Sequence, residues 1–100
     1  MYFLGIDAGG TSTKARLVNG AGDIIGEGTA GPGNIRLGFE TVHAAITAAY
    51  SEATSQAGLS DSEIKNIRAG FGIAGLGRPG AEEALQAQPF PFKNITLLND

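Results

Sequence analysis

The sequence predicts one α/β domain built on a mixed sheet, with the element order β-β-β-α-β-α-β. Short apolar runs recur along the 100 residues, and most of them end in Gly-rich or polar turns. One longer segment repeats apolar residues at three- and four-residue spacing, which indicates an amphipathic helix. Hydrophobic residues make up 42% of the chain, which is enough for a packed core and too many for a disordered chain.

The first thirty residues predict a three-stranded antiparallel meander. The second strand alternates Ala15 and Leu17 with Lys14 and Arg16, so one of its faces is wetter than the other. The Gly-rich segment 19–23 is typical of a hairpin turn and joins this strand to the third. The predicted strands of the meander are residues 2–7, 13–18 and 24–29.

The rest of the chain predicts two helices and two further strands. The longer helix begins near Phe39 and ends at Gly58, a residue type that favours helix termination. Ser60 and Glu63 have the spacing of a capping box and predict a short helical turn. Helical crossovers make the later strands parallel, and the meander then forms the antiparallel edge of the sheet. The remaining elements are a strand at 67–74, a short helix at 81–88 and a strand at 94–98.

Composition excludes several classes of protein. The chain has no Cys, which excludes a disulfide-stapled fold and a Cys-based metal or iron–sulfur site within these residues. The net charge of −3 provides no basic surface for nucleic acid or for an anionic membrane. The apolar runs are much shorter than the roughly 18 residues of a membrane span, and no basic segment opens the chain. We therefore expect no nucleic-acid partner, no membrane partner and no secretory leader.

Glycine is enriched, and many glycines lie where predicted strands end. The chain has 16 Gly, about twice the usual ~7%. If the first, fourth and fifth strands are parallel neighbours, the polar or Gly-rich segments 7–13, 75–77 and 99–100 meet at one sheet edge. Ligands of such sheets bind at this edge. Four glycines inside strands have no assigned role: Gly26, Gly28, Gly70 and Gly72.

The segment 7–13 has the residue types that suit the terminal phosphates of a nucleotide. The Asp7 carboxylate can orient Mg²⁺, directly or through its waters. Gly9 and Gly10 have no Cβ, so phosphate oxygens can approach their backbone N–H groups. The hydroxyls of Thr11, Ser12 and Thr13 add donors at the same turn. A plain β-turn is the alternative, because Asp and Gly are common there. A P-loop is excluded, since no Gly-Lys-Ser/Thr follows.

Residues 7–14, Asp-Ala-Gly-Gly-Thr-Ser-Thr-Lys, resemble the first phosphate motif of the sugar kinase/Hsp70/actin superfamily. Segments 31–38, 72–75 and 99–100 are similar to the matching parts of its BadF/BadG/BcrA/BcrD-type ATPase branch. Within that branch they are most similar to the glucosamine and N-acetylglucosamine kinases. The resemblance covers essentially the whole chain. It implies a ribonuclease H-like, or actin-like ATPase, domain with a mixed five-stranded sheet.

The resemblance implies an ATP-dependent carbohydrate kinase that transfers the γ-phosphoryl group to the 6-hydroxyl of glucosamine or N-acetylglucosamine. The implied cofactors are ATP and Mg²⁺, with Asp7 orienting the metal. Asn34, Gly75 and Asn99 would contact the sugar, and Asp100 would contact it as the catalytic base. Some aminosugar kinases have Ser where this chain has Ala74, which leaves the preferred aminosugar open. The implied ATP-phosphate contacts are Asp7, Gly9, Gly10, Thr11, Ser12 and Thr13.

Several of these residues have a simpler alternative role. A carboxylate that accepts the proton of the attacking hydroxyl is the usual protein contribution to phosphoryl transfer, which supports Asp100 as the base. The alternative for Asp100 is a solvated chain end, and for Asn34 it is a turn residue that follows Gly. For Lys14 and Arg16, a solvated strand face is favoured over phosphate contact.

The sequence predicts a structural role for three side chains with aromatic or imidazole rings. His43 lies beside the apolar stripe of the long helix, where no other His, Cys or carboxylate cluster accompanies it. We therefore expect it to flank the helix and not to act as a ligand or base. Phe90 and Phe92 lie between prolines and are expected to anchor the core.

The family's kinases have two lobes with the active site between them, so residues 1–100 are expected to form the N-terminal lobe. The second lobe, with a further Gly-rich phosphate loop and the adenosine pocket, lies outside this chain. We therefore expect the lobe alone to be inactive, because half of the clamp is missing, and to expose hydrophobic surface meant for the other lobe. Use of ATP and an acidic composition indicate a cytoplasmic location. A homodimer is left open.

Two rival functions are retained. One is the ATPase activator of an iron–sulfur dehydratase or reductase, in which ATP hydrolysis drives electron transfer to a partner protein. The other is a non-catalytic nucleotide-binding lobe. Asn34 and the ending Asn99-Asp100 favour the kinase over the activator.

Overall fold

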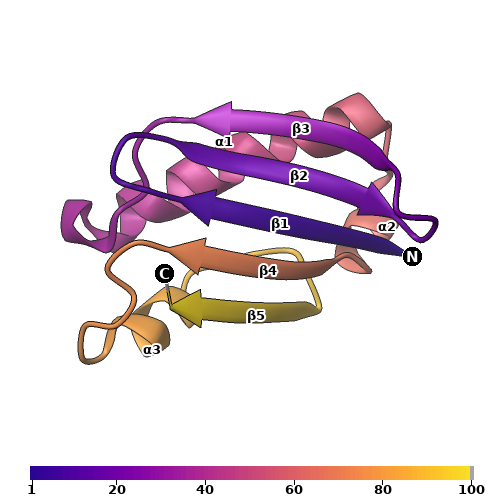
Figure 1. Cartoon of the computed structure of the whole chain (residues 1–100). Helices are drawn as coiled ribbons and strands as arrows, with labels where there is room; N and C mark the ends of the chain where they lie inside the picture. The colour runs from indigo at the N-terminus through magenta and orange to yellow at the C-terminus, as the bar shows by residue number, and fades with distance from the viewer. Residues whose placement is uncertain (100) are drawn as a thin grey trace.

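The computed structural model describes residues 1–99, and of Asn99 only the backbone. It has one five-stranded mixed sheet of order β3-β2-β1-β4-β5, with helices packed on one face (Figure 1). The predicted α/β class and element order are confirmed. The strands are β1 (Tyr2–Ala8), β2 (Thr13–Asn19), β3 (Ile24–Ala30), β4 (Arg68–Ile73) and β5 (Asn94–Asn99).

The strand directions bring several loops to one edge. β1 pairs antiparallel with β2 and parallel with β4, and β4 pairs parallel with β5. In Figure 1 the heads of β1, β3, β4 and β5 point to the same edge, while β2 begins there. The residues that follow β1 and β4 are therefore neighbours, as expected from parallel pairing, and the segment after β3 begins at the same edge.

The helices follow the expected stop and start residues. The helical elements are η1 (Ile35–Leu37), α1 (Phe39–Ala57), α2 (Asp61–Lys65) and α3 (Ala81–Gln86). Gly58 ends α1 in the left-handed conformation with φ of 69°, which glycine adopts without strain. Ser60 and Glu63 form the predicted capping box of α2. The 3₁₀ helix η1 was not predicted, because three residues are too few to show a periodic pattern.

Two glycines of β3 allow α1 to lie very close to the sheet. A Cβ at Gly26 would stand 2.1 Å from the carbonyl oxygen of Ala53, and one at Gly28 would stand 2.0 Å from that of Ala49. These distances are far shorter than any van der Waals contact, so only Gly fits at either position. The role that the sequence left open for Gly26 and Gly28 is therefore close packing of helix on sheet.

The core lies between the sheet and α1. Leu4 and Ile6 of β1 and Val42 and Ile46 of α1 are buried in it. The ring centroid of Phe92 lies 4.9 Å from that of Tyr50 in an edge-on arrangement, which is favourable beyond its area burial. Phe90 packs edge-on against Phe71. The prediction that Phe90 and Phe92 anchor the core is confirmed. Among the described residues, no helix is both long and apolar enough to cross a bilayer.

The opposite face of the sheet is open to solvent. Along β1, Phe3, Gly5 and Asp7 are exposed, while the alternating residues are buried. Phe3 is 42% exposed and Leu98 is 56% exposed. The lobe thus exposes apolar side chains on this face, which agrees with the expectation of exposed hydrophobic surface.

Candidate functional site

The turn between β1 and β2 presents free backbone donors at the shared sheet edge. The N–H of Gly9 donates to the carbonyl oxygen of Ser12 at 2.9 Å, which closes the turn, so the expectation that this N–H contacts phosphate is corrected. The backbone N–H groups of Gly10, Thr11 and Ser12 make no hydrogen bond to another residue that the structure describes. A Cβ at Gly10 would meet no atom within 4 Å, so the space around it is open. Consecutive free N–H groups in such a turn suit an anion.

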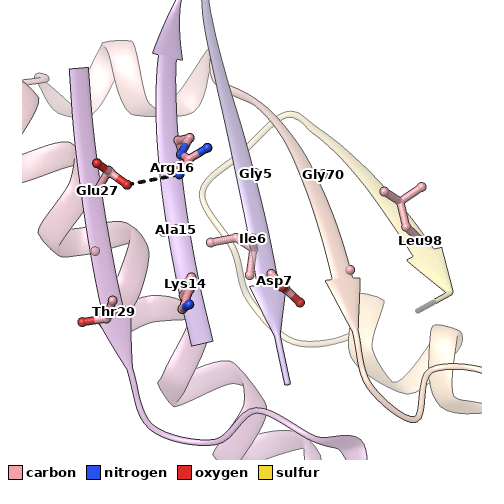
Figure 2. A pocket seen from close by; sticks show the side chains of 12 residues that line it. Gly5, Ile6, Asp7, Lys14, Ala15, Arg16, Glu27, Thr29, Gly70 and Leu98 are labelled. Carbon is pink, nitrogen blue, oxygen red and sulfur yellow. Dashed lines mark ion pairs between the residues drawn. The ribbon is translucent and has the colours of Figure 1, made fainter. Parts of the chain in front are cut away.

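Asp7 lies directly before this turn, beside a cation. It is exposed, and its cross-strand partner in β2 is Lys14. Its parallel neighbour in β4 is Gly72, which has no side chain to cover it. Figure 2 shows Asp7 near the head of β1 with Lys14 beside it on β2. A carboxylate that is open on one side can hold Mg²⁺ there, while the cation on its other side attracts the phosphate bound to that metal.

A shallow hollow on the open face extends from this carboxylate toward the middle of the sheet. Its volume is about 740 Å³, and Asp7 and Lys14 line one end of it. At the other end Arg16 forms an exposed ion pair of 3.5 Å with Glu27 (Figure 2), and such exposed pairs contribute little to stability. Arg16 thus has the solvated-face role that the sequence favoured. Asn34 and Gly75 do not line this hollow.

The side chain of Thr13 does not point where the sequence led us to expect. Its side chain is 0% exposed, and its hydroxyl donates to the carbonyl oxygen of Gly31 at 2.8 Å. The hydroxyl therefore points into the fold and is not available to a phosphate. The expectation is corrected for this side chain, whereas Thr11 is exposed and Ser12 half-buried at the turn. The pattern of hydroxyls in the sequence cannot show this, because the partner Gly31 lies 18 residues away.

The structure brings Asn34 and Gly75 together. The side-chain oxygen of Asn34 accepts from the backbone N–H of Arg36 at 2.9 Å and caps η1. A Cβ at Gly75 would stand 3.0 Å from that same oxygen, and Gly75 has a φ of +87°. Glycine at position 75 therefore allows both the turn after β4 and the close approach of Asn34. The amide nitrogen of Asn34 has no hydrogen bond to another described residue, so it can donate to a ligand.

Backbone hydrogen bonds connect the three loops at this edge. Gly33 donates to the carbonyl of Gly9, and Ala74 donates to that of Ala8, both at 2.9 Å. Ile35 donates to the carbonyl of Ala74 at 3.0 Å. The segment that contains Asn34 is thus attached on one side to the β1–β2 turn and on the other to the loop after β4. The sequence alone does not show these connections, because they form only when the three loops come together in the folded chain.

The strand β5 extends to the same edge. The Cα of Asn99 is the register partner of Ile73, the last residue of β4. The side chain of Asn99 and all of Asp100 lie outside the described residues, so their proposed contacts with sugar stay predictions.

His43 has the structural role that was expected of it. Its Nε2 atom hydrogen-bonds the carbonyl oxygen of Pro89, and its ring lies 4.9 Å from that of Phe90. The imidazole therefore attaches α1 to the segment before β5.

The residues present fit a magnesium ion that is held mostly by its waters and by phosphate. Among the side chains that the structure describes, no three His, Asp or Glu residues gather closely enough to hold a metal alone. Mg²⁺ commonly binds through one or two carboxylates together with substrate phosphates and keeps several waters. Exposed Asp7 beside the free N–H groups of the turn provides such a carboxylate.

The sequence and the fold of this chain are both similar to those of known proteins. The chain is 38% identical over 99 residues to the glucosamine kinase GspK of Vibrio cholerae serotype O1, covering 99% of this chain and 34% of that one. The crystal structure of a protein provisionally described as an N-acetylglucosamine kinase, from Chromobacterium violaceum, matches with a TM-score of 0.86 and 24% identity over 98% of this chain and 34% of that one.

A more distant match is component A of (R)-2-hydroxyglutaryl-CoA dehydratase from Acidaminococcus fermentans, with a TM-score of 0.50 and 18% identity over 97% of this chain and 30% of that one. At these identities, both solved structures show the fold alone, which is the predicted actin-like lobe. The chain spans about a third of the length of the curated relative that it matches. The model of the BadF/BadG/BcrA/BcrD ATPase family matches residues 4–97, and the chain therefore belongs to this family.

Proposed function

We propose that this chain is the N-terminal lobe of an ATP-dependent aminosugar kinase that acts on glucosamine or N-acetylglucosamine. The observation that supports this most is the connection of two loops. A turn with three free backbone N–H groups beside Asp7 is hydrogen-bonded, through Gly9 and Gly33, to the segment that contains Asn34. This connection supports a proposal in which the nucleotide and the acceptor sugar bind next to each other. The 38% identity to a glucosamine kinase over the whole chain supports the same substrate class.

Each polar group of the site has a chemical role in this proposal. Asp7 orients the metal, and the N–H groups of Gly10, Thr11 and Ser12 hold phosphate oxygens. The amide nitrogen of Asn34 donates to a sugar hydroxyl. Bound MgATP supplies the γ-phosphoryl group and the metal that shares its charge.

Asp100 is the proposed general base. It accepts the proton of the 6-hydroxyl while the oxygen–phosphorus bond forms and the bond from phosphorus to ADP breaks. Phosphoryl transfer depends mainly on such positioning and on charge stabilisation. A carboxylate within hydrogen-bond reach of the hydroxyl is therefore the chemical contribution that this lobe would make.

The complete enzyme is proposed to contain a second lobe. The chain covers 34% of the related glucosamine kinase, and the described lobe is open to solvent on the side of Asp7. We infer that the nucleotide is held between the two lobes, so the lobe alone gives little turnover. We propose a cytoplasmic location, because the proposed reaction uses ATP.

The test is ADP release by the full-length protein with Mg²⁺ and ATP across a panel of hexoses and aminosugars. Glucosamine or N-acetylglucosamine should stimulate release strongly, and glucose, mannose and galactose should stimulate it weakly. Absence of any aminosugar-dependent release would refute the kinase. ATP hydrolysis that no sugar changes would favour the activator function, in which hydrolysis drives a change in a partner protein.

A further inference from the structure

Thr13 is one of two buried polar side chains among the described residues, and it joins two loops. Its hydroxyl donates at 2.8 Å to the carbonyl oxygen of Gly31, in the segment that follows β3. Thr13 itself is the first residue of β2 and directly follows the turn with the free N–H groups. The hydroxyl therefore connects the base of the nucleotide turn to the start of the segment that contains Asn34.

Close packing at Gly33 fixes the same segment at a second point. A Cβ at Gly33 would stand 2.6 Å from the hydroxyl oxygen of Thr13 and 2.8 Å from the Cβ of Ala8. Gly33 also donates its backbone N–H to the carbonyl of Gly9 at 2.9 Å. Gly33, which has no side chain of its own, thus packs directly on Thr13 and Ala8 of the nucleotide hairpin, and Asn34 is the next residue.

We propose that Thr13 is a positioning residue: its hydroxyl fixes segment 31–35 to the nucleotide turn, so that nucleotide binding orders the segment that presents Asn34 to the acceptor. This inference rests on the proposed function. It differs from the role implied by the sequence, in which the Thr13 hydroxyl contacts phosphate. Thr13 touches neither substrate and acts through Gly31.

The physical reason is that the Thr13 hydroxyl, which is buried, holds the exposed segment at Gly31 to the hairpin. Without the hydroxyl, the carbonyl of Gly31 accepts from water instead, and the segment is no longer held to the hairpin at this point. Because Asn34 lies three residues further on, a small shift of Gly31 moves its amide. A displacement of about 1 Å can reduce transfer by about 10²-fold even when it arises away from the chemistry.

The test compares hydrogen exchange of segment 31–37 in the full-length protein with and without MgADP. The wild type is compared with Thr13→Val, which keeps the shape and removes the hydroxyl, and with Thr13→Ser, which keeps the hydroxyl. MgADP should slow exchange of this segment by a factor on the order of five to ten in the wild type and in T13S. This factor is at the lower end of the usual energetic coupling between two sites. In T13V the effect of MgADP should be lost.

Thr54→Val is the matched control. Thr54 is the other buried threonine, 4% exposed, and its hydroxyl donates to the carbonyl of Ser51 one turn earlier in α1. This variant also loses a buried hydroxyl, but away from the loops, and should respond to MgADP as the wild type does. An equal loss of protection in T54V would show a general loss of stability and would overturn the proposal.

The affinity for MgADP separates the two roles of Thr13. A positioning role leaves this affinity close to the wild-type value in T13V, while a direct phosphate contact lowers it. A marked loss of MgADP affinity in T13V, or a wild type in which MgADP leaves segment 31–37 unchanged, would therefore overturn the inference.

Turnover distinguishes the failure of the inference from the failure of the proposed function. T13V should lower kcat/KM for glucosamine by about tenfold or more, and T13S should restore it. Protection of segment 31–37 without any aminosugar turnover would refute the kinase and leave the positioning role intact. Normal turnover of T13V would refute the positioning role and leave the kinase intact.

Discussion

Asp7 combines exposure, a neighbouring cation and free backbone donors, which makes it the most informative single residue of the site. Its carboxylate makes no hydrogen bond to another side chain that the structure describes, and Gly72 leaves one side of it bare. Its substitution should therefore affect ligand binding more than folding. In the proposed enzyme its loss removes an anchor of the metal.

Asp7→Asn should lower the affinity of the full-length protein for MgADP by roughly 10- to 100-fold, the range for losing a group that orients a metal. Isothermal titration with and without Mg²⁺ measures this. Asp23→Asn is the control, because Asp23 is an exposed carboxylate in the hairpin turn between β2 and β3. Equal affinities for D7N and D23N would exclude Asp7 from the metal site.

Asp100→Asn should leave sugar binding close to wild type and reduce turnover by at least about 10²-fold, as expected for removal of a general base. Equilibrium binding of glucosamine and the initial rate of ADP release are the two measurements. A D100N enzyme with wild-type turnover would remove Asp100 from the role of base.

At this scale the sequence predicts a phosphate site at Asp7 and the turn, because their residue types suit phosphate directly, and this stays a prediction. It did not identify the roles of Thr13 or Gly33. Their partners, Gly31 and Gly9, come close only after the segment following β3 folds back onto the β1–β2 hairpin. Such contacts depend on tertiary structure and leave no local pattern.

Among the elements, the contact of α1 with β3 depends most on single residues. The helix backbone lies so close to the strand that a methyl group at Gly28 would overlap the carbonyl of Ala49. Gly5 lies in the same sheet on the open face, and a Cβ there would meet nothing within 4 Å. The two glycines thus form a matched pair with opposite surroundings.

Gly28→Ala should lower the free energy of unfolding by about 1–3 kcal/mol or more, because the helix must move away from the strand. Gly5→Ala should leave it unchanged or raise it slightly, since Ala restricts the unfolded chain more than Gly does. Urea unfolding followed by circular dichroism measures both. Equal free energies of unfolding for the two variants would contradict the close contact of α1 with β3.

The start of α2 gives the molecule a pH-dependent contact. The backbone N–H of Ser60 and the hydroxyl of Tyr2 donate to the Glu63 carboxylate, and these hydrogen bonds lower the pKa of Glu63. The same contact raises the pKa of Tyr2. A carboxyl whose pKa is lowered by folding stabilises the fold above its unfolded pKa and loses this effect as pH falls through the folded value.

We therefore expect Glu63 to contribute to stability at neutral pH and to lose that contribution as pH falls below its usual pKa of 4.5. Urea unfolding at a series of pH values from 7 to 3 measures this in the wild type and in Glu63→Gln, whose profile should be flatter. Glu82→Gln, an exposed acidic residue in the first turn of α3, is the control. The same flattening in both variants would contradict a specific role for Glu63.

The sequence predicted most element boundaries to within one or two residues, because alternation, capping residues and glycine stops are local. It did not predict the irregular register between Leu17 and Val18, where β3 contributes an additional residue opposite β2. That irregularity depends on how two strands pair, and neither strand shows it alone. The same limit applies to Gly26 and Gly28, whose role depends on where α1 crosses the sheet.

The whole molecule is best described as one lobe with a covered and an open face. The covered face has a close-packed core under α1. The open face exposes Phe3 and Leu98 and ends at Asp7. The matched glucosamine kinase is about three times as long, since the chain covers 34% of it. The fold and the family follow from these residues, whereas the reaction is a proposal for the full-length protein.

Transfer of labelled phosphate by the full-length protein tests the kinase proposal most directly, because it separates a sugar acceptor from water. ATP labelled at the γ-phosphorus is incubated with Mg²⁺ and glucosamine, and the products are separated. The proposal predicts labelled aminosugar phosphate and no labelled product when 6-deoxyglucosamine replaces glucosamine. Label found only in inorganic phosphate, or bound to the 6-deoxy sugar, would contradict it.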